Sequence, residues 1–244
     1  MRPPLAVRDK YLVYGTLFLG RSSLIFFTVF LFYGSVNIVN LGLDEFAALA
    51  LNTCLSLAFF IQHSGMIRSS FQRWSTRWIG ERYHGASFTI ASSILLIVLV
   101  AFWQKSGLVI YSADGALRMV FRAVFVLSFI GFGWGIRSLG SFDAFGVRPI
   151  CQEAQSPSPT QVALKIRGPY RWVRHPLYLF CITMIWSCPD LTGDRLLFNL
   201  LWTAWIVVGT VLEERDLVAR FGDEYRSYQA QVPMLIPMSV GPAR

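Results

Sequence analysis

The sequence predicts an all-α integral membrane protein with about six membrane-spanning helices and a C-terminal helical region on the cytoplasmic side. Hydrophobic residues make up 54% of the 244 residues, and only 15% are charged. A soluble domain usually has about a quarter of its residues charged, so this composition argues against a water-soluble globule. Long uncharged apolar runs also recur along the chain, and the basic residues fall mainly between alternate runs.

Six apolar runs are candidates for membrane spans, because a spanning helix needs about 20 apolar residues. They cover residues 13–38, 46–66, 86–104, 118–139, 177–190 and 196–212. The fifth run is short and ends at Pro189. We therefore expect it to be tilted, or to form a tight hairpin with the sixth run through residues 190–195.

The net charge of +8 would suggest a nucleic-acid partner in a soluble domain. In a membrane protein, basic residues collect in cytoplasmic loops. If the N-terminus is cytoplasmic, 17 of the 22 Lys and Arg residues lie on the inner side. The outer side holds only Lys105, Arg118, Arg122 and Arg195, and Arg21 lies within the first span. This bias predicts that both termini are cytoplasmic and that the partner is the lipid bilayer, not a nucleic acid.

We expect one membrane domain over residues 1–244, since no internal repeat or long linker divides the chain. Residues 1–140 hold four spans, and residues 141–244 hold a loop, a helix hairpin and a tail. The polar inner parts are residues 67–85, 140–176 and the tail from Glu213.

The densest polar cluster precedes the fifth span, at residues 168–178. Pro176 can begin a helix, because a backbone N–H at the first helical position would have no partner within the helix, and proline lacks that N–H. Arg174 and His175 would then lie beside a positive helix end, which suits an anionic ligand group. The alternative is an interfacial collar in which Tyr170 and Tyr178 belong to an aromatic belt.

The sixth span ends in two carboxylates, Glu213 and Glu214. Ionisable residues at the edge of a membrane are candidates for function. The alternative is an ion pair with Arg174 or Arg215 that fixes the helix hairpin. We expect the helix to continue to Phe221 and to stop at Gly222, before a short amphipathic helix.

His63 lies at the inner end of the second span, on the same side as these clusters. A single histidine at a helix end is more often an interfacial hydrogen-bonding residue than a catalyst. The three histidines are far apart in sequence and the four cysteines show no CxxC spacing, so we expect no metal site.

The ordered set Arg174-His175-Pro176-x-Tyr178, then Glu213-Glu214, then Phe221-Gly222-x-Glu224-Tyr225, resembles the isoprenylcysteine carboxyl methyltransferase superfamily. Within it, the chain is most similar to the methanethiol S-methyltransferase (NnrU-like) branch. This similarity extends to the first half of the chain, where Gln62-His63-Ser64 has no counterpart in the prenylcysteine enzymes. The resemblance implies a membrane methyltransferase of the bacterial inner membrane, with S-adenosylmethionine bound at the cytoplasmic face.

The resemblance also implies which residues form the site. Arg174 and His175 would hold the cofactor's carboxylate, and Glu213 would hold its ammonium group or ribose hydroxyls. His63 is the candidate catalytic base for a thiol. The full set implied for the cofactor is Val162, Ala163, Leu164, Lys165, Tyr170, Arg174, His175, Pro176, Leu177, Tyr178, Glu213 and Glu214.

The acceptor implied by this branch is a small thiol, with methanethiol converted to dimethyl sulfide. Carboxyl-methylating relatives place an arginine one turn before the glutamate pair, where this chain has Gly209. Ser141 and Asp194 depart from the thiol branch, which often has histidine at these positions. A prenylcysteine, lipid or other acceptor, or a non-enzymatic NnrU-type membrane protein, are the alternatives, and the oligomeric state is open.

Overall fold

The computed structural model describes residues 6–140, 143–152, 164 and 166–237, and most of them are helical. Within these residues, five helical segments are long and apolar enough to cross a membrane. They are α1 (Val7–Tyr33), α2 (Glu45–Ile67), the segment Glu81–Phe102, α5 (Gly115–Ser138) and α8 (Gly193–Phe221). The protein is therefore a helical integral membrane protein.

The remaining elements are shorter. The segment Glu81–Phe102 consists of a 3₁₀ turn, η1 (Glu81–Tyr83), and α4 (His84–Phe102). The others are α3 (Ser69–Ile79), β1 (Val109–Ser112), α6 (Arg148–Cys151), η2 (Gly168–Arg171), α7 (Pro176–Trp186), β2 (Asp190–Thr192) and α9 (Asp223–Gln231). Helix α7 is apolar but has only 11 residues, so it is not among the five long segments.

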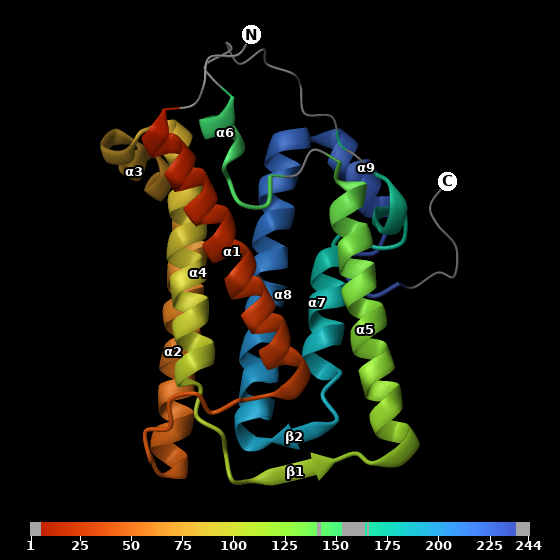
Figure 1. Cartoon of the computed structure of the whole chain (residues 1–244). Coiled ribbons are helices and arrows are strands. Elements are labelled where there is room, and N and C mark those ends of the chain that lie inside the picture. Colours follow the sequence, from red (N-terminus) through yellow and green to blue (C-terminus); the bar gives the residue numbers. More distant parts are fainter. Residues whose placement is uncertain (1–5, 141–142, 153–163, 165, 238–244) are drawn as a thin grey trace. The chain divides into compact units, whose positions relative to one another are not determined.

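The chain forms two compact units. Their residues can be followed in Figure 1 by the colour bar, which runs along the sequence. The first contains residues 1–106 and 143–160, and the second contains residues 107–142 and 161–244. The sequence division at residue 140 groups the fourth span with the first three. In the structure that span, α5, packs against α7 within the second unit. The single membrane domain stays a prediction.

The first unit is built from α1, α2 and α4. Phe30 and Trp103, both almost fully buried, pack edge to face with ring centroids 5.6 Å apart. Asn52 on α2 lies in this apolar interior, where its side chain exchanges two hydrogen bonds with the backbone of Gln104 just after α4. A buried amide must find partners, so this pair fixes the end of α4 against α2.

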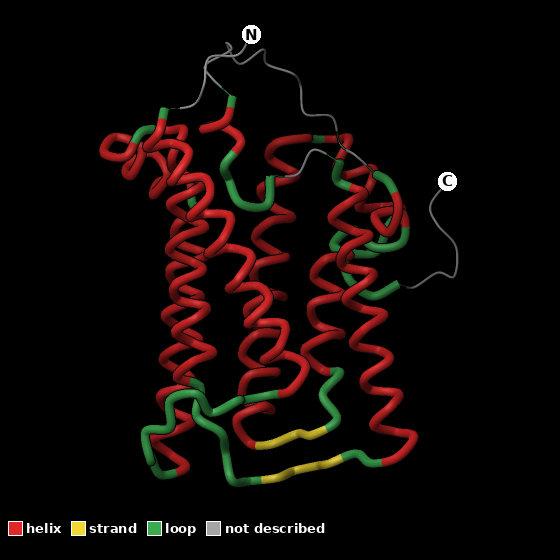
Figure 2. Tube along the Cα trace, in the orientation of Figure 1, coloured by secondary structure: helices red, strands yellow, loops and turns green. Residues whose placement is uncertain are grey.

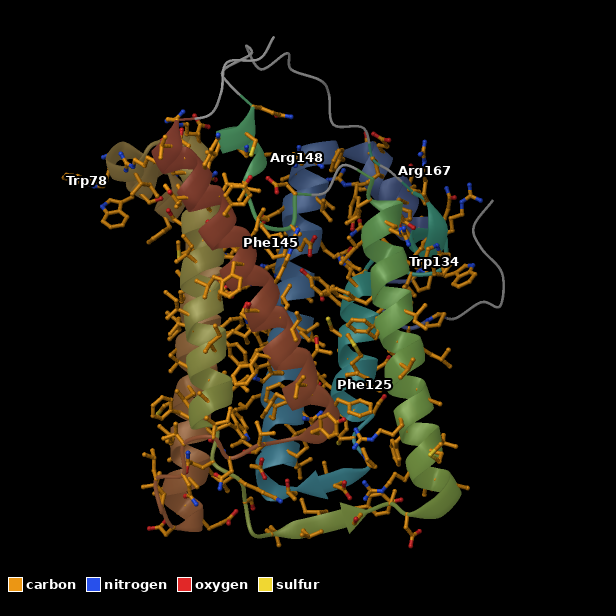
Figure 3. All side chains as sticks on the ribbon, viewed as in Figure 1. Trp78, Phe125, Trp134, Phe145, Arg148 and Arg167 are labelled. Carbon is orange, nitrogen blue, oxygen red and sulfur yellow. The ribbon has the colours of Figure 1, made fainter. Side chains whose placement is uncertain are left out.

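The segment after residue 142 returns to the first unit. The Thr89 hydroxyl donates to the Phe145 carbonyl, and the Phe145 ring, labelled in Figure 3, lies over Gly20. At Gly85 and Gly146 the two backbones touch, since a Cβ added to Gly85 would lie 2.7 Å from the Cα of Gly146. Gly146 also has a φ of +64°, which few other residues adopt.

The second unit rests on close packing of α5 and α7. Gly131 and Gly135 lie one turn apart on α5, and they receive Phe180 and Leu177 of α7. Small residues let helix backbones approach closely where lipid supplies no hydrophobic drive between helices. Helix α7 is therefore held against α5, with its first turn beside the polar segment that precedes it.

A two-stranded antiparallel ribbon, β1–β2, closes one end of the second unit and is yellow in Figure 2. Arg118 supports it by a bidentate ion pair with Asp190, at 2.9 and 2.5 Å. Burial tends to raise the pKa of Asp190, but hydrogen bonds from Arg118 and Ser112 hold this pKa below its usual range. The all-α prediction from the sequence missed this two-stranded ribbon.

Several predicted boundaries were wrong by a few residues. The first helix ends at Tyr33 rather than at 38, because the chain turns at Gly34 with a φ of +85°. The fifth ends at Trp186 rather than at 190, since residues from Asp190 pair with β1. The sixth continues to Phe221, followed by Gly222 and α9, as predicted. Arg195, counted as an outer-loop charge, is buried in the first turn of α8.

Replacement of Gly85 by alanine is expected to destabilise the protein by about 1–3 kcal/mol, because the new methyl group meets backbone that cannot rotate away. Thermal unfolding of the detergent-solubilised protein measures this. Gly15→Ala is the matched control, since a Cβ there meets nothing within 4 Å. Equal melting temperatures for the two variants would contradict the close contact.

Candidate functional site

The candidate site lies at the end of α8 that is remote from the ribbon. Glu213 follows Gly193, the first residue of α8, by 20 positions. At 1.5 Å per residue this is about 30 Å, which matches the thickness of a hydrocarbon core. The start of α8 beside the ribbon and the glutamate pair are therefore separated by about the thickness of a hydrocarbon core.

Arg174, which lies just before α7, binds the Glu214 carboxylate through two hydrogen bonds. Arg174 Nε donates to Glu214 Oε1 at 2.9 Å, and Arg174 Nη2 donates to Glu214 Oε2 at 2.8 Å. Both side chains are only 10% exposed. This bidentate geometry gives strong, directional hydrogen bonds. The ion pair with Arg174, left open as an alternative by the sequence, is present.

Three more side chains bind the same carboxylate. His175 Nε2 lies 2.6 Å from Oε1, and the Tyr225 hydroxyl donates to Oε1 at 2.7 Å. Gln229 Nε2 donates to Oε2 at 2.5 Å. Tyr225 and Gln229 lie one turn apart on α9, so they present their polar groups on one face of that helix. Glu214 thus connects α8, α9 and the segment before α7.

The backbone after α9 completes this connection. The N–H groups of Arg174 and His175 donate to the carbonyl oxygens of Pro233 and Met234. Arg174 Nη1 donates to the carbonyl oxygens of Gln229 and Val232. The guanidinium group therefore satisfies both a buried carboxylate and the end of α9. Most of its donors are committed within the protein.

Glu213, the neighbouring residue, is more open, with 43% of its side chain exposed. Its Oε2 accepts a hydrogen bond from the Tyr178 hydroxyl at 2.7 Å. His175 Nδ1 lies 3.8 Å from the same oxygen. The rings of His175 and Tyr178 are stacked, with an interplanar angle of 11°. The buried imidazole therefore lies between the two glutamates.

Tyrosines around the glutamates are held in the protonated form. Burial and the nearby Glu213 carboxylate raise the pKa of Tyr170, which lies outside the spans. Burial and the hydrogen bond to Glu214 raise the pKa of Tyr225. The Tyr228 hydroxyl donates to the Tyr170 carbonyl, and burial raises its pKa. These phenols remain hydrogen-bond donors at neutral pH.

Other residues singled out by the sequence take supporting places. Pro176 begins α7, and Leu177 packs on Gly135 of α5. Leu164 packs with the cluster formed by Tyr225, Tyr228 and Val232. Trp134, labelled in Figure 3, packs edge to face with Trp172 near the same end of α5.

Other residues that the sequence predicted for the site are not found around Glu213 and Glu214 among the described residues. Val162, Ala163 and Lys165 lie outside the described residues. His63 belongs to the first unit, where its ring packs between Phe59 and Phe88. Among the side chains that the structure describes, no group of three His, Cys, Asp or Glu residues is arranged to hold a metal ion.

The sequence did not identify Gln229 as part of the cluster. Its only signal is the spacing of four residues from Tyr225 on a short helix, which does not by itself point to Glu214. Only the return of α9 onto α8 reveals the contact.

The fold and the site define a polytopic helical membrane protein in which two glutamates, a histidine and several tyrosines gather at one end of the second unit. Over 196 residues, 78% of this chain, it is 35% identical to a methanethiol S-methyltransferase from a Pseudomonas species, covering 74% of that protein. It is 32% identical over 191 residues to the methanethiol S-methyltransferase of Mycobacterium tuberculosis, covering 78% of each chain. The chain therefore belongs to the methanethiol S-methyltransferase family.

A more distant similarity links the chain to Nurim of the rat, at 26% identity over 180 residues, or 70% of this chain and 68% of Nurim. No family model and no solved structure matches the chain. As a member of this family the protein is an S-methyltransferase, and its reaction requires a methyl donor.

Removal of the Glu214 carboxylate by Glu214→Ala is expected to cost about 3–5 kcal/mol of folding stability, because Arg174 is left buried without its counter-ion. Tyr225→Phe, which removes one donor, should cost about 1 kcal/mol. Thermal unfolding in detergent measures both. Glu224→Gln on the exposed side of α9 is the control, and a similar small effect of all three variants would contradict the role of Glu214.

Proposed function

We propose that this protein transfers a methyl group from S-adenosylmethionine to methanethiol and releases dimethyl sulfide. The observation that carries the proposal is the extensive similarity to methanethiol S-methyltransferases, which covers about three quarters of each chain. The site supports it, because two residues that the resemblance implies for the cofactor lie at the open Glu213 carboxylate: Tyr178 donates to it and His175 Nδ1 is 3.8 Å away.

The residues around Glu213 fit the proposed cofactor. Oε2 of Glu213 accepts from Tyr178, whereas no hydrogen bond to Oε1 is found among the described residues. An exposed carboxylate oxygen suits an ammonium group or the ribose hydroxyls. When bound, S-adenosylmethionine supplies an electrophilic methyl group on a cationic sulfonium. Tyr170, His175 and Tyr178 would form the wall beside Glu213.

Arg174 and Glu214 take a different part in this proposal from the one that the sequence implied. Their side chains are bound to each other, to α9 and to the tail. They would therefore position the turn that carries His175 and the start of α7, and would not themselves hold the cofactor's carboxylate. His175 Nδ1 remains a candidate for that carboxylate, because its backbone N–H and Nε2 are bound to Met234 and Glu214. Val162, Ala163 and Lys165, outside the described residues, are further candidates, with Leu164, Pro176 and Leu177 lining the site.

The proposed topology has six spans, with α7 as a short fifth span and both termini in the cytoplasm. The bias of 17 inner against four outer basic residues supports this orientation. It places Glu213 on the cytoplasmic side and the ribbon on the outer side of a bacterial inner membrane. Cytoplasmic access suits a cofactor that is made in the cytoplasm.

The proposed acceptor is a small thiol rather than a carboxylate. Gly209 lies one turn before Glu213 and has no side chain. A side chain at this position would have room, because an added Cβ meets nothing within 4 Å. A carboxylate acceptor would need a cation at such a place, typically a bidentate arginine. A thiol needs only to lose its proton, because the thiolate is the nucleophile. We propose His63 as the base.

The purified protein is expected to transfer isotopically labelled methyl from S-adenosylmethionine to methanethiol, forming labelled dimethyl sulfide. Gas chromatography with mass spectrometry measures the product, and a prenylcysteine and a phosphatidylethanolamine serve as competing acceptors. Methylation of either competitor in place of methanethiol would replace the proposed substrate. Absence of S-adenosylmethionine binding would overturn the proposal.

Glu213→Gln is expected to weaken S-adenosylmethionine binding about 10-fold, because a neutral amide replaces the charge-assisted acceptor. Isothermal titration in detergent measures the dissociation constant. Glu224→Gln removes an exposed carboxylate on α9 and should bind normally. Unchanged binding by Glu213→Gln would remove Glu213 from the cofactor site.

His63→Gln is expected to lower kcat/KM for methanethiol about 100-fold at pH 7, with unchanged cofactor binding. The loss should shrink as the pH rises through the pKa of the thiol, because the thiolate then forms without a base. A pH profile of both proteins measures this. A loss that is equal at pH 7 and pH 10 would show that His63 has only a structural role.

A further inference from the structure

Helix α3 links the ends of α2 and α4 in the first unit, and Figure 1 shows it set across them. It has 11 residues, including Arg73 and Arg77, so it is too short and too polar to span a bilayer. Its inner side is anchored, since Ser75 Oγ lies 3.0 Å from His84 Nδ1. The helix is therefore held at the level where the spans leave the hydrocarbon.

The exposed part of α3 is divided into an aromatic side and a basic side. Trp74 and Trp78 lie one turn apart and are 57% and 80% exposed. Figure 3 shows Trp78 projecting away from the bundle. Arg73 and Arg77 form a second row, displaced from the tryptophans by one residue, or about 100° around the helix. Such a helix is typical of one that lies in the plane of a membrane interface.

The arginines of this segment have no counter-charge within the described protein. Arg68, Arg73 and Arg77 are exposed and form no ion pair with any residue that the structure describes. Residues 68–80 contain no Asp or Glu. Arg82, by contrast, lies 3.4 Å from Asp9. The open guanidinium groups are suited to bidentate contact with phosphate.

We propose that α3 lies in the headgroup layer at the end of α2 and binds anionic phospholipids through Arg68, Arg73 and Arg77. Tryptophan favours this depth because its ring is apolar and its N–H is polar. Ile67 and Ile61 of α2, which precede α3 in the chain, are 60% and 73% exposed. This exposed apolar surface on the neighbouring span, together with the unpaired positive charge of α3, favours lipid over a protein partner.

The test uses the full-length protein in nanodiscs that contain equal amounts of phosphatidylcholine and phosphatidylglycerol. Native mass spectrometry identifies the lipid that remains bound after the protein is released from the nanodisc. The wild-type protein should retain phosphatidylglycerol preferentially, and Arg73→Gln/Arg77→Gln should reduce that preference about 30-fold, since each of the two basic residues near the surface contributes about 1 kcal/mol. Arg220→Gln/Arg226→Gln, which removes the same charge elsewhere, should keep it.

Equal loss of preference in the two double variants would show a bulk charge effect and overturn the proposal. An unchanged lipid preference in the α3 variant would also overturn the proposal. A change from dimer to monomer on Trp78→Ser would overturn it too, because it would identify a second copy of the chain as the occupant of this surface. If the α3 variant does not fold, the wild-type preference is measured in about 0.05 M and about 0.5 M salt. A preference that does not fall with salt would equally overturn it.

Discussion

The Glu214 carboxylate is the constraint on which the second unit depends. Five hydrogen bonds converge on its two oxygens, from side chains on α9 and from the segment before α7. Arg174 and His175 are 40 and 39 positions from Glu214 along the chain. Tyr225 and Gln229 lie on the next helix, α9, which also packs against the last turns of α8 through the apolar cluster around Tyr225 and Tyr228. A buried carboxylate without partners is costly, and these donors together compensate for the burial of Glu214. The network therefore sets where the tail returns to α8.

The two adjacent glutamates consequently have different environments. Glu214 faces α9 and is enclosed, whereas Glu213 is partly open and contacts Tyr178. Consecutive residues on a helix point about 100° apart, so one can serve the structure while the other stays accessible. His175 lies between them and bonds to Glu214. Its ring orientation, and that of the stacked Tyr178, depends on the enclosed glutamate.

Elsewhere the helices pack through small residues and hydrogen bonds, as is typical of membrane proteins. Gly131 and Gly135 bring α7 against α5, and Gly85 brings the returning segment against α4. Polar contacts also join the helices, as when buried Asn52 of α2 exchanges two hydrogen bonds with the backbone of Gln104 after α4. The lipid solvent supplies little drive for helix association, so close contact and hydrogen bonding hold the helices together.

The sequence by itself determined the membrane class, five of the spans to within a few residues, and the identity of the polar residues near Glu213 and Glu214. Apolar length reports the membrane class and the spans directly, because both depend on the bilayer and not on the fold. The polar residues were identified by the motif resemblance. Only the tertiary structure decided that Arg174 pairs with Glu214, that Gln229 joins them, and that β1 pairs with β2. These contacts join residues 15 to 83 positions apart, and no local pattern specifies which distant donor meets a given carboxylate.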